Sequence, residues 1–323
     1  MKKLFMMMSL MLISVLLFSC SQQEEEFESK SVAEQTFEKS DEAAFARFRL
    51  QVEELDRSYG FSRPGFYTRF NLWRLIKKAL QVCYADAAGA IVGAGIGTSV
   101  SGGNPVGAVA GAVIGGVGAS YAVACLPVEV ETPSPHLSPA QYQMLRANAL
   151  SGLIFSNAFI PTKLDSIGFY HNAVVINMYE DDASIMDSTT YSRSDLLDSV
   201  ATYHHVFNIS NLEMNSINKD SIISKCNSQI RSYLSLVEKT GDISIIPNTP
   251  EWEKNSLVLP IIENYVVNIC DENSTADLQE YTSDYLSLVD NSELSASEKQ
   301  RLRMGVTVAY SSKKLWGRGL VLQ

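Results

Sequence analysis

Two glycine-spaced stretches decide the fold, GAIVGAGIG at residues 89–97 and GAVAGAVIG at residues 107–115. Glycines that recur every four residues lie on one face of a helix, where the missing side chains let two backbones approach closely. The intervening SGGNP at residues 101–105 has glycines suited to a helix end, then an Asn cap and a Pro suited to the first helical position. The pattern predicts an antiparallel glycine-zipper helical hairpin. Its helix-packing glycines are Gly89, Gly93, Gly97, Gly107, Gly111 and Gly115.

The hairpin lies within a run without charge. Residues 87–128 contain no charged side chain, and 11 of the 19 glycines fall between Gly89 and Gly118. A membrane-spanning helix needs about 20 apolar residues. The second arm, 105–125, meets that length, whereas the first, 87–100, would reach only about 21 Å at the helical rise. Two interpretations stay open: a hairpin buried in the body of the protein, or one that inserts into a membrane or an oligomer.

The remaining sequence predicts an all-α, multi-helix body. Helical periodicity begins at Asp41 and returns over 163–180, 192–206, 218–239, 250–270, 275–290 and 296–316, with Pro260 expected to kink or split its helix. Ser138 with Gln141, and Ser295 with Glu298, form capping-box patterns. Only 172–178 and 242–247 suggest strands. We expect N-terminal helices and the hairpin over 41–129, a linker over 130–139 and a C-terminal helical domain over 140–323.

The first residues have the pattern of a lipoprotein signal. Lys2 and Lys3 precede an apolar run from Leu4 to Phe18, which is too short for a comfortable membrane span. LFSC at 17–20 resembles a lipobox, so residues 1–19 are predicted to be a signal peptide and Cys20 the lipidation site. The alternative is an ordinary signal peptide with an incidental cysteine. Residues 20–40 are acidic and polar and are interpreted as a tether.

Two short patterns resemble those of Bacteroidetes surface lipoproteins. QQEEE at 22–26 is similar to the acidic surface-export signal of that phylum. Four Asp-Ser-aliphatic or Asp-Ser-Thr triplets resemble its O-glycosylation sequon, although Asp-Ser also suits helix caps. The resemblance implies an outer-membrane, lipid-anchored protein exposed at the cell surface. The implied glycosylation sites are Ser166, Ser188, Ser199 and Ser221.

The hairpin carries a second resemblance. Residues 86–124 resemble the glycine-zipper two-transmembrane segments of bacterial envelope proteins and the GxxxG arms of bacteriocin-like toxins. The combination of this hairpin with Gly168, His171 and Asn172 and with the closing segment 309–316 is similar to uncharacterised Bacteroidetes lipoproteins. The toxin resemblance implies membrane activity, but such toxins are short secreted peptides, and this segment lies inside a chain of 323 residues.

Four cysteines follow Cys20, and an oxidising compartment favours their pairing. Cys83 and Cys125 are each 21 residues from Asn104, so a hairpin turning there would bring them together. Cys226 and Cys270 would then pair by elimination. The alternative is four free, buried thiols.

The sequence contains no catalytic constellation: it lacks GxSxG, HExxH, a P-loop and the dinucleotide fingerprint. We therefore predict no catalytic residue, metal or cofactor. Gly168, His171 and Asn172 lie together in an apolar segment and are interpreted as a polar node. A buried, hydrogen-bonded histidine is the favoured explanation, with a catalytic or ligand role as the alternative.

The net charge of −10 excludes nucleic acid as a partner, because an acidic surface is repelled by phosphates. The expected partners are the membrane through Cys20 and a second copy of the chain or another envelope protein. The function expected from the sequence is a structural or partner-binding outer-membrane lipoprotein. The alternative is a membrane-active protein that works through the hairpin.

Overall fold

A computed structural model describes residues 42–61, 78–124, 138–151, 166–181, 217–271 and 276–316. Every regular element among these residues is a helix, so the predicted all-α class is confirmed. Neither of the two segments that suggested strands forms one: 172–178 is helical and 242–247 is irregular. The chain divides into two compact units, residues 1–47 and 48–323. A helix over residues 42–58 crosses that division.

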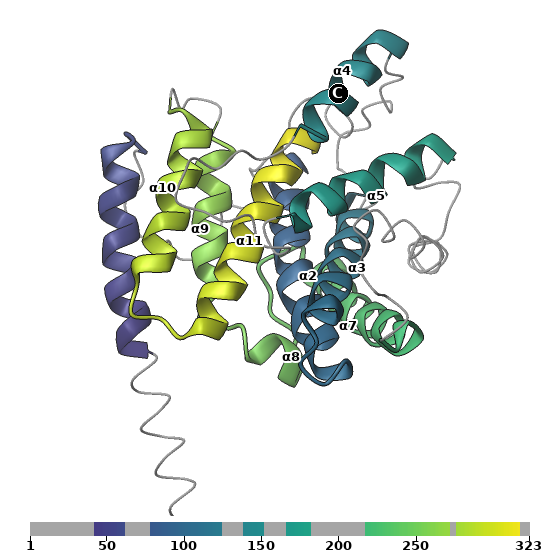
Figure 1. The fold of residues 1–323 in the computed structure, drawn as a ribbon, viewed down its shortest axis with the longest axis horizontal. Helices are drawn as coiled ribbons and strands as arrows, with labels where there is room; N and C mark the ends of the chain where they lie inside the picture. The colour runs from purple at the N-terminus through teal and green to yellow at the C-terminus, as the bar shows by residue number, and fades with distance from the viewer. Residues whose placement is uncertain are drawn as a thin grey trace, which may run out of the picture. The chain divides into compact units, whose positions relative to one another are not determined.

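The longest apolar helices are α2 (Lys78–Val100) and α3 (Pro105–Ala124), which pack along each other (Figure 1). The turn between them has Gly102 and Gly103 at positive φ, and the Asn104 side chain accepts a hydrogen bond of 2.9 Å from the Val106 amide. Left-handed glycines end a helix, and an Asn cap starts the next one. The chain therefore reverses within four residues.

Glycine sets the distance between α2 and α3. Gly89 lies against Gly115, Gly93 against Gly111 and Gly97 against Gly107, in antiparallel order. A Cβ added at any of these six positions would overlap the backbone of the opposite helix or, at Gly107, also the Ser101 side chain. The backbones are therefore in direct contact, which side chains of any size would prevent.

Other helices enclose this pair. α11 (Ala296–Leu315) packs on α2 and on α5 (Ile167–Asp181), while α7 (Lys219–Thr240) packs on α3 and α2. Ile91, Val113 and Tyr121 are completely buried, and most of the other side chains of α2 and α3 are buried too. The α2–α3 pair is thus the centre of the unit formed by residues 48–323. Elements from both sides of the predicted linker share this core.

Local sequence signals set most helix ends. α4 (Pro139–Ala149) and α11 begin with the two predicted capping boxes, and α7 ends at Gly241 in the left-handed region. The predicted helix over 250–270 is split into α8 (Pro250–Glu253) and α9 (Leu259–Ile269), with Pro260 in the first turn of α9. Proline lacks the amide needed inside a helix but suits its start, which explains the split.

A buried carboxyl group in the helix over residues 42–58 contacts α9 and α10 (Leu278–Asn291). Asp56, which is 1% exposed, accepts hydrogen bonds from Tyr281 Oη at 2.7 Å and Asn264 Nδ2 at 2.8 Å. Phe48 packs edge-on against Tyr285, so residues 48–58 join α9 and α10 through both polar and aromatic contacts.

Several predictions fall outside the described residues: the signal peptide and Cys20, the tether up to residue 40, most of the 130–139 linker, and the helix over 192–206.

Candidate functional site

The predicted polar node is part of a larger cluster in which four helices meet. His171 and Asn172 come from α5, Asp86 from α2 and Ser120 from α3. Ser312 and the C-cap Trp316 come from α11. All six side chains have zero exposed area. We call these six residues the Asp86 cluster.

The Asp86 carboxylate is the acceptor at the centre of this cluster. Its Oδ2 accepts hydrogen bonds from Ser312 Oγ at 2.5 Å and Trp316 Nε1 at 3.1 Å. Its Oδ1 accepts a short hydrogen bond from Ser120 Oγ. His171 Nε2 lies 3.3 Å from Oδ2. A buried carboxylate needs such donors, because leaving it without partners is costly.

The hydrogen bonds around His171 define where its protons are. Asn172 Nδ2 donates to Ala149 O at 3.0 Å and Ser311 O at 2.8 Å, so its Oδ1 must be the acceptor. His171 Nδ1, 3.0 Å from that oxygen, is therefore a donor. Ser120 Oγ donates to Asp86 and lies 3.1 Å from His171 Nε2. Both ring nitrogens of His171 therefore have polar partners, and Nε2 faces the Asp86 carboxyl group.

Burial raises the pKa of the Asp86 carboxyl above its usual value. The charge of His171, followed by the hydrogen bonds from Ser120, Ser312 and Trp316, acts in the opposite direction. Desolvation disfavours a charged carboxylate, whereas a nearby cation and donors favour it. Asp86 is therefore a buried acid whose polar partners come from α3, α5 and α11.

Two glycines make room for the cluster. A Cβ at Gly168 would overlap Ser311 Oγ and the Thr307 carbonyl, so the predicted glycine lets α5 lie directly on α11. A Cβ at Gly116 would lie 3.1 Å from the His171 ring, which makes Gly116 the residue that accommodates the imidazole beside α3.

Ser, His and Asp lie together here, but not in the arrangement of a nucleophilic triad. In a triad the serine contacts one ring nitrogen of the histidine and the aspartate the other. In this cluster Ser120 and Asp86 both contact Nε2, and Nδ1 is occupied by Asn172. A substrate also has no route to a serine with zero exposed area. The arrangement holds helices together, as the core interpretation of His171 expects.

The cysteines differ from the predicted pairing. Cys83, Cys226 and Cys270 are free thiols, so the predicted Cys226–Cys270 disulfide is not formed, and neither is a bridge from Cys83. Cys125 lies outside the described residues. Cys226 Sγ points at the Gly111 carbonyl, 3.9 Å away on α3, whereas the Cys83 thiol donates to that of Cys270. The pairing of Cys226 with Cys270, inferred by elimination, was wrong because Cys270 lies at the end of α9 on the side that faces α2.

Of the four predicted glycosylation sites, Ser166 and Ser221 lie among the described residues and are not part of the cluster. Ser166 is half-buried just before α5, Ser221 is half-buried in the first turn of α7, and Ser188 and Ser199 are outside the described residues. His136, His204 and His205 are also outside them. Across the described residues, no three His, Cys, Asp or Glu side chains gather in a group suited to a metal ion.

Sequence reasoning found the α5 residues of the cluster and missed their partners. Asp86 carried a usable signal, because it is the only charged residue between Lys78 and Glu129. A lone acid in an apolar helix requires a buried donor set. Ser120, Ser312 and Trp316 had no such signal, since they lie 34 to 230 residues from Asp86 along the chain.

The chain matches no protein-family model, no curated protein sequence and no solved structure.

Proposed function

We propose that this chain is an outer-membrane lipoprotein, anchored through Cys20, with a structural or partner-binding role. In this proposal the α2–α3 pair is the internal scaffold of the helical body. The observation that supports this role is that the apolar surface of the pair is buried inside the protein. Its inner faces meet backbone to backbone, and its outer faces meet α5, α7, α9 and α11.

The Asp86 cluster supports the scaffold role. Asp86 lies on α2 and Ser120 on α3, and their partners belong to α5 and α11. Moving the pair out of the body would separate a buried ion pair and leave its charges without partners. Breaking such a pair costs about 3–5 kcal/mol. The cluster therefore fixes the pair in place.

Vesicle experiments test this proposal. A chain that begins after Cys20 is mixed with liposomes that contain a quenched dye, and its partition between buffer and lipid is measured by flotation. We expect it to remain in the buffer and to release no dye, while the full-length, acylated chain floats with the vesicles. A Cys20→Ser chain that is still acylated and still floats would contradict the anchor. Dye release by the chain without the anchor would contradict the scaffold.

One observation favours a second function, membrane activity through the pair. Ala79–Val100 and Pro105–Val123 are long and apolar enough to cross a membrane, with mean hydropathies of 1.4 and 1.7. In the folded body 89% and 94% of these windows are buried, so insertion would require the pair to leave its surroundings. The core helices of a water-soluble body would have the same length and composition.

The second function makes opposite predictions for two changes. Asp86→Asn removes the charge that ties α2 to α5 and α11, so it should increase dye release if insertion occurs. A short cross-link between the adjacent thiols of Cys83 and Cys270 ties α2 to α9 and should abolish that release until it is cleaved. Under the scaffold proposal neither change produces dye release.

A further inference from the structure

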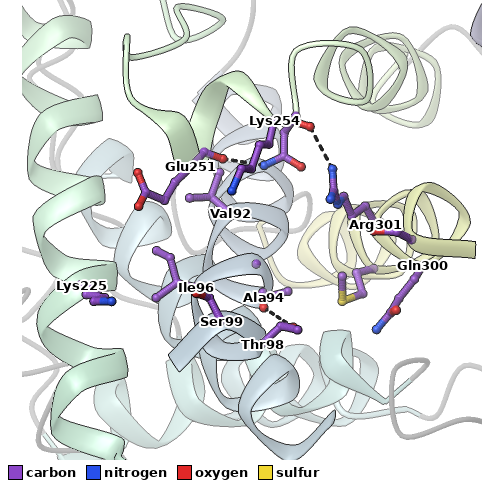
Figure 2. Close-up of a pocket in the computed structure, with 14 residues that line it drawn as sticks. Val92, Ala94, Ile96, Thr98, Ser99, Lys225, Glu251, Lys254, Gln300 and Arg301 are labelled. Atoms are coloured by element: carbon purple, nitrogen blue, oxygen red, sulfur yellow. Dashed lines mark hydrogen bonds between the residues drawn. The ribbon is translucent and has the colours of Figure 1, made fainter. Parts of the chain in front are cut away.

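A cavity of about 290 Å³ opens between α2, α7, α8 and α11 (Figure 2). It is separate from the Asp86 cluster and shares no residue with it. Its floor is apolar and is formed by Val92 and Ile96 of α2 together with Met304 of α11. Small-molecule sites in proteins have this character, an apolar concave surface with a few placed polar groups.

The walls of the cavity are cationic. Lys225 lies on the α7 side, Lys254 follows α8, and Arg301 lies on α11 (Figure 2). Glu251 is the one acidic residue among the lining side chains. This local excess of positive charge contrasts with the net charge of −10 for the whole chain. Cations from three different elements that converge on one cavity favour an anionic occupant.

These cations have no carboxylate partner among the described residues. Within the described part of the chain, Lys225, Lys254 and Arg301 form no ion pair with a carboxylate. Arg301 lines the cavity, and its Nη1 donates to the Lys254 carbonyl at 2.9 Å (Figure 2). Burial lowers the pKa of Arg301, and the nearby Glu298 opposes this effect. An anion in the cavity would stabilise the charged form of this partly buried guanidinium.

We propose that this cavity binds a small organic acid. Its carboxylate contacts Lys225, Lys254 and Arg301, and an aliphatic portion lies on the apolar floor. The volume is at the lower end of the range for small-molecule pockets, so the ligand is smaller than a typical drug. This inference is independent of the anchor and of the scaffold role.

N-acetyl-leucine is the probe, because it combines a carboxylate, an amide N–H and an aliphatic side chain. The full-length protein in mild detergent, labelled at its Met and Ile methyl groups, is titrated and followed by NMR. We expect saturable shifts at Met304 and Ile96. The methyl ester lacks the carboxylate charge and should bind about tenfold more weakly, the change expected from losing a charge-assisted contact.

Two variants locate the contacts. Lys225→Gln should weaken binding about threefold, as for one partly exposed ion pair, whereas Lys239→Gln, an exposed lysine near the other end of α7, should leave it unchanged. Far-UV circular dichroism checks that each variant is folded.

Several results would overturn the proposal. One is the absence of methyl shifts up to the solubility limit of the probe. Others are equal affinity for the acid and its ester, or equal effects of Lys225→Gln and Lys239→Gln. Because the probe is not a lipid and no vesicle is present, these outcomes are distinct from failure of the anchor or the scaffold.

Discussion

Asp86 of α2 and His171 of α5 face each other with no exposed area, and Nε2 lies 3.3 Å from Oδ2. Removal of either partner leaves the other buried without its counter-charge. We expect Asp86→Asn and His171→Gln each to lower the free energy of unfolding by about 3–5 kcal/mol. The double variant should lose less than the sum of the two, because the second change removes the stranded charge. Guanidinium unfolding followed by circular dichroism measures the coupling, and strict additivity would contradict the ion pair.

Gly93 and Gly95 provide a matched test on one helix. A Cβ at Gly93 would overlap the Gly111 backbone, while one at Gly95 meets nothing within 4 Å. We expect Gly93→Ala to destabilise the protein by about 1–3 kcal/mol through overpacking. Gly95→Ala should stabilise it by up to about 1 kcal/mol through helix propensity. Thermal unfolding compares the two, and equal shifts in Tm would show that α2 and α3 are not in backbone contact.

The buried tyrosines predict an alkaline limit to stability. Burial raises the pKa of Tyr233, Tyr265, Tyr281 and Tyr285 in the folded state above the unfolded value of about 10. A raised pKa means that the folded state keeps its protons longer than the unfolded state. The stability from these groups is therefore complete below about pH 10 and is lost as the pH rises further. Tyrosinate absorbance should appear together with unfolding, and separate titration of these side chains would contradict the prediction.

Two of these tyrosines should respond differently to loss of the hydroxyl. Tyr285 Oη is buried and has no hydrogen-bond partner among the described residues, whereas Tyr281 Oη donates to Asp56. Tyr285→Phe should be neutral or stabilising by up to about 1 kcal/mol, and Tyr281→Phe should destabilise by about 1.5–3 kcal/mol. Denaturant midpoints measure both. A larger loss for Tyr285→Phe than for Tyr281→Phe would contradict the contact with Asp56.

The thiols should react in a defined order. The hydrogen bond from Cys83 lowers the pKa of Cys270, which is half-buried, whereas burial raises the pKa of Cys226 to about 12. The thiolate is the reactive form, so iodoacetamide should modify Cys270 first and Cys226 last. Mild oxidation should join Cys83 to Cys270. Peptide mapping identifies the products, and a Cys226–Cys270 linkage in the folded protein would contradict the structure.

Local patterns predicted the helices well, because caps and prolines act on their own neighbours. Ser138, Ser295 and Pro260 each begin or interrupt a helix where expected. The spacing of the glycines indicated which face of α2 would meet α3. Contacts between distant segments were not predictable in this way. The cysteine pairing failed because chain symmetry about Asn104 says nothing about the side of α9 on which Cys270 ends.

In the candidate site too, local signals were predictable from the sequence and contacts between distant segments were not. His171 and Asn172 stand out in the sequence as polar residues in an apolar segment. Nothing in the local pattern pairs them with Asp86, which directly precedes the charge-free run. Lys225, Lys254, Asn255 and Arg301 are ordinary surface-type residues in sequence, and only the fold gathers them around one cavity. A cavity lined from four helices leaves no periodic signal in the chain.

The Asp86 cluster lies at one end of the α2–α3 pair, close to residues 78 and 124, while the turn at 101–104 lies at the other. The turn has two exposed glycines, and the helix ends next to it meet at Gly97 and Gly107. The buried polar contacts of the pair are therefore concentrated at the end away from the turn. In hydrogen exchange, amides around residue 100 should exchange through local fraying, whereas those around Asp86 and Ser120 should exchange only when the whole unit unfolds.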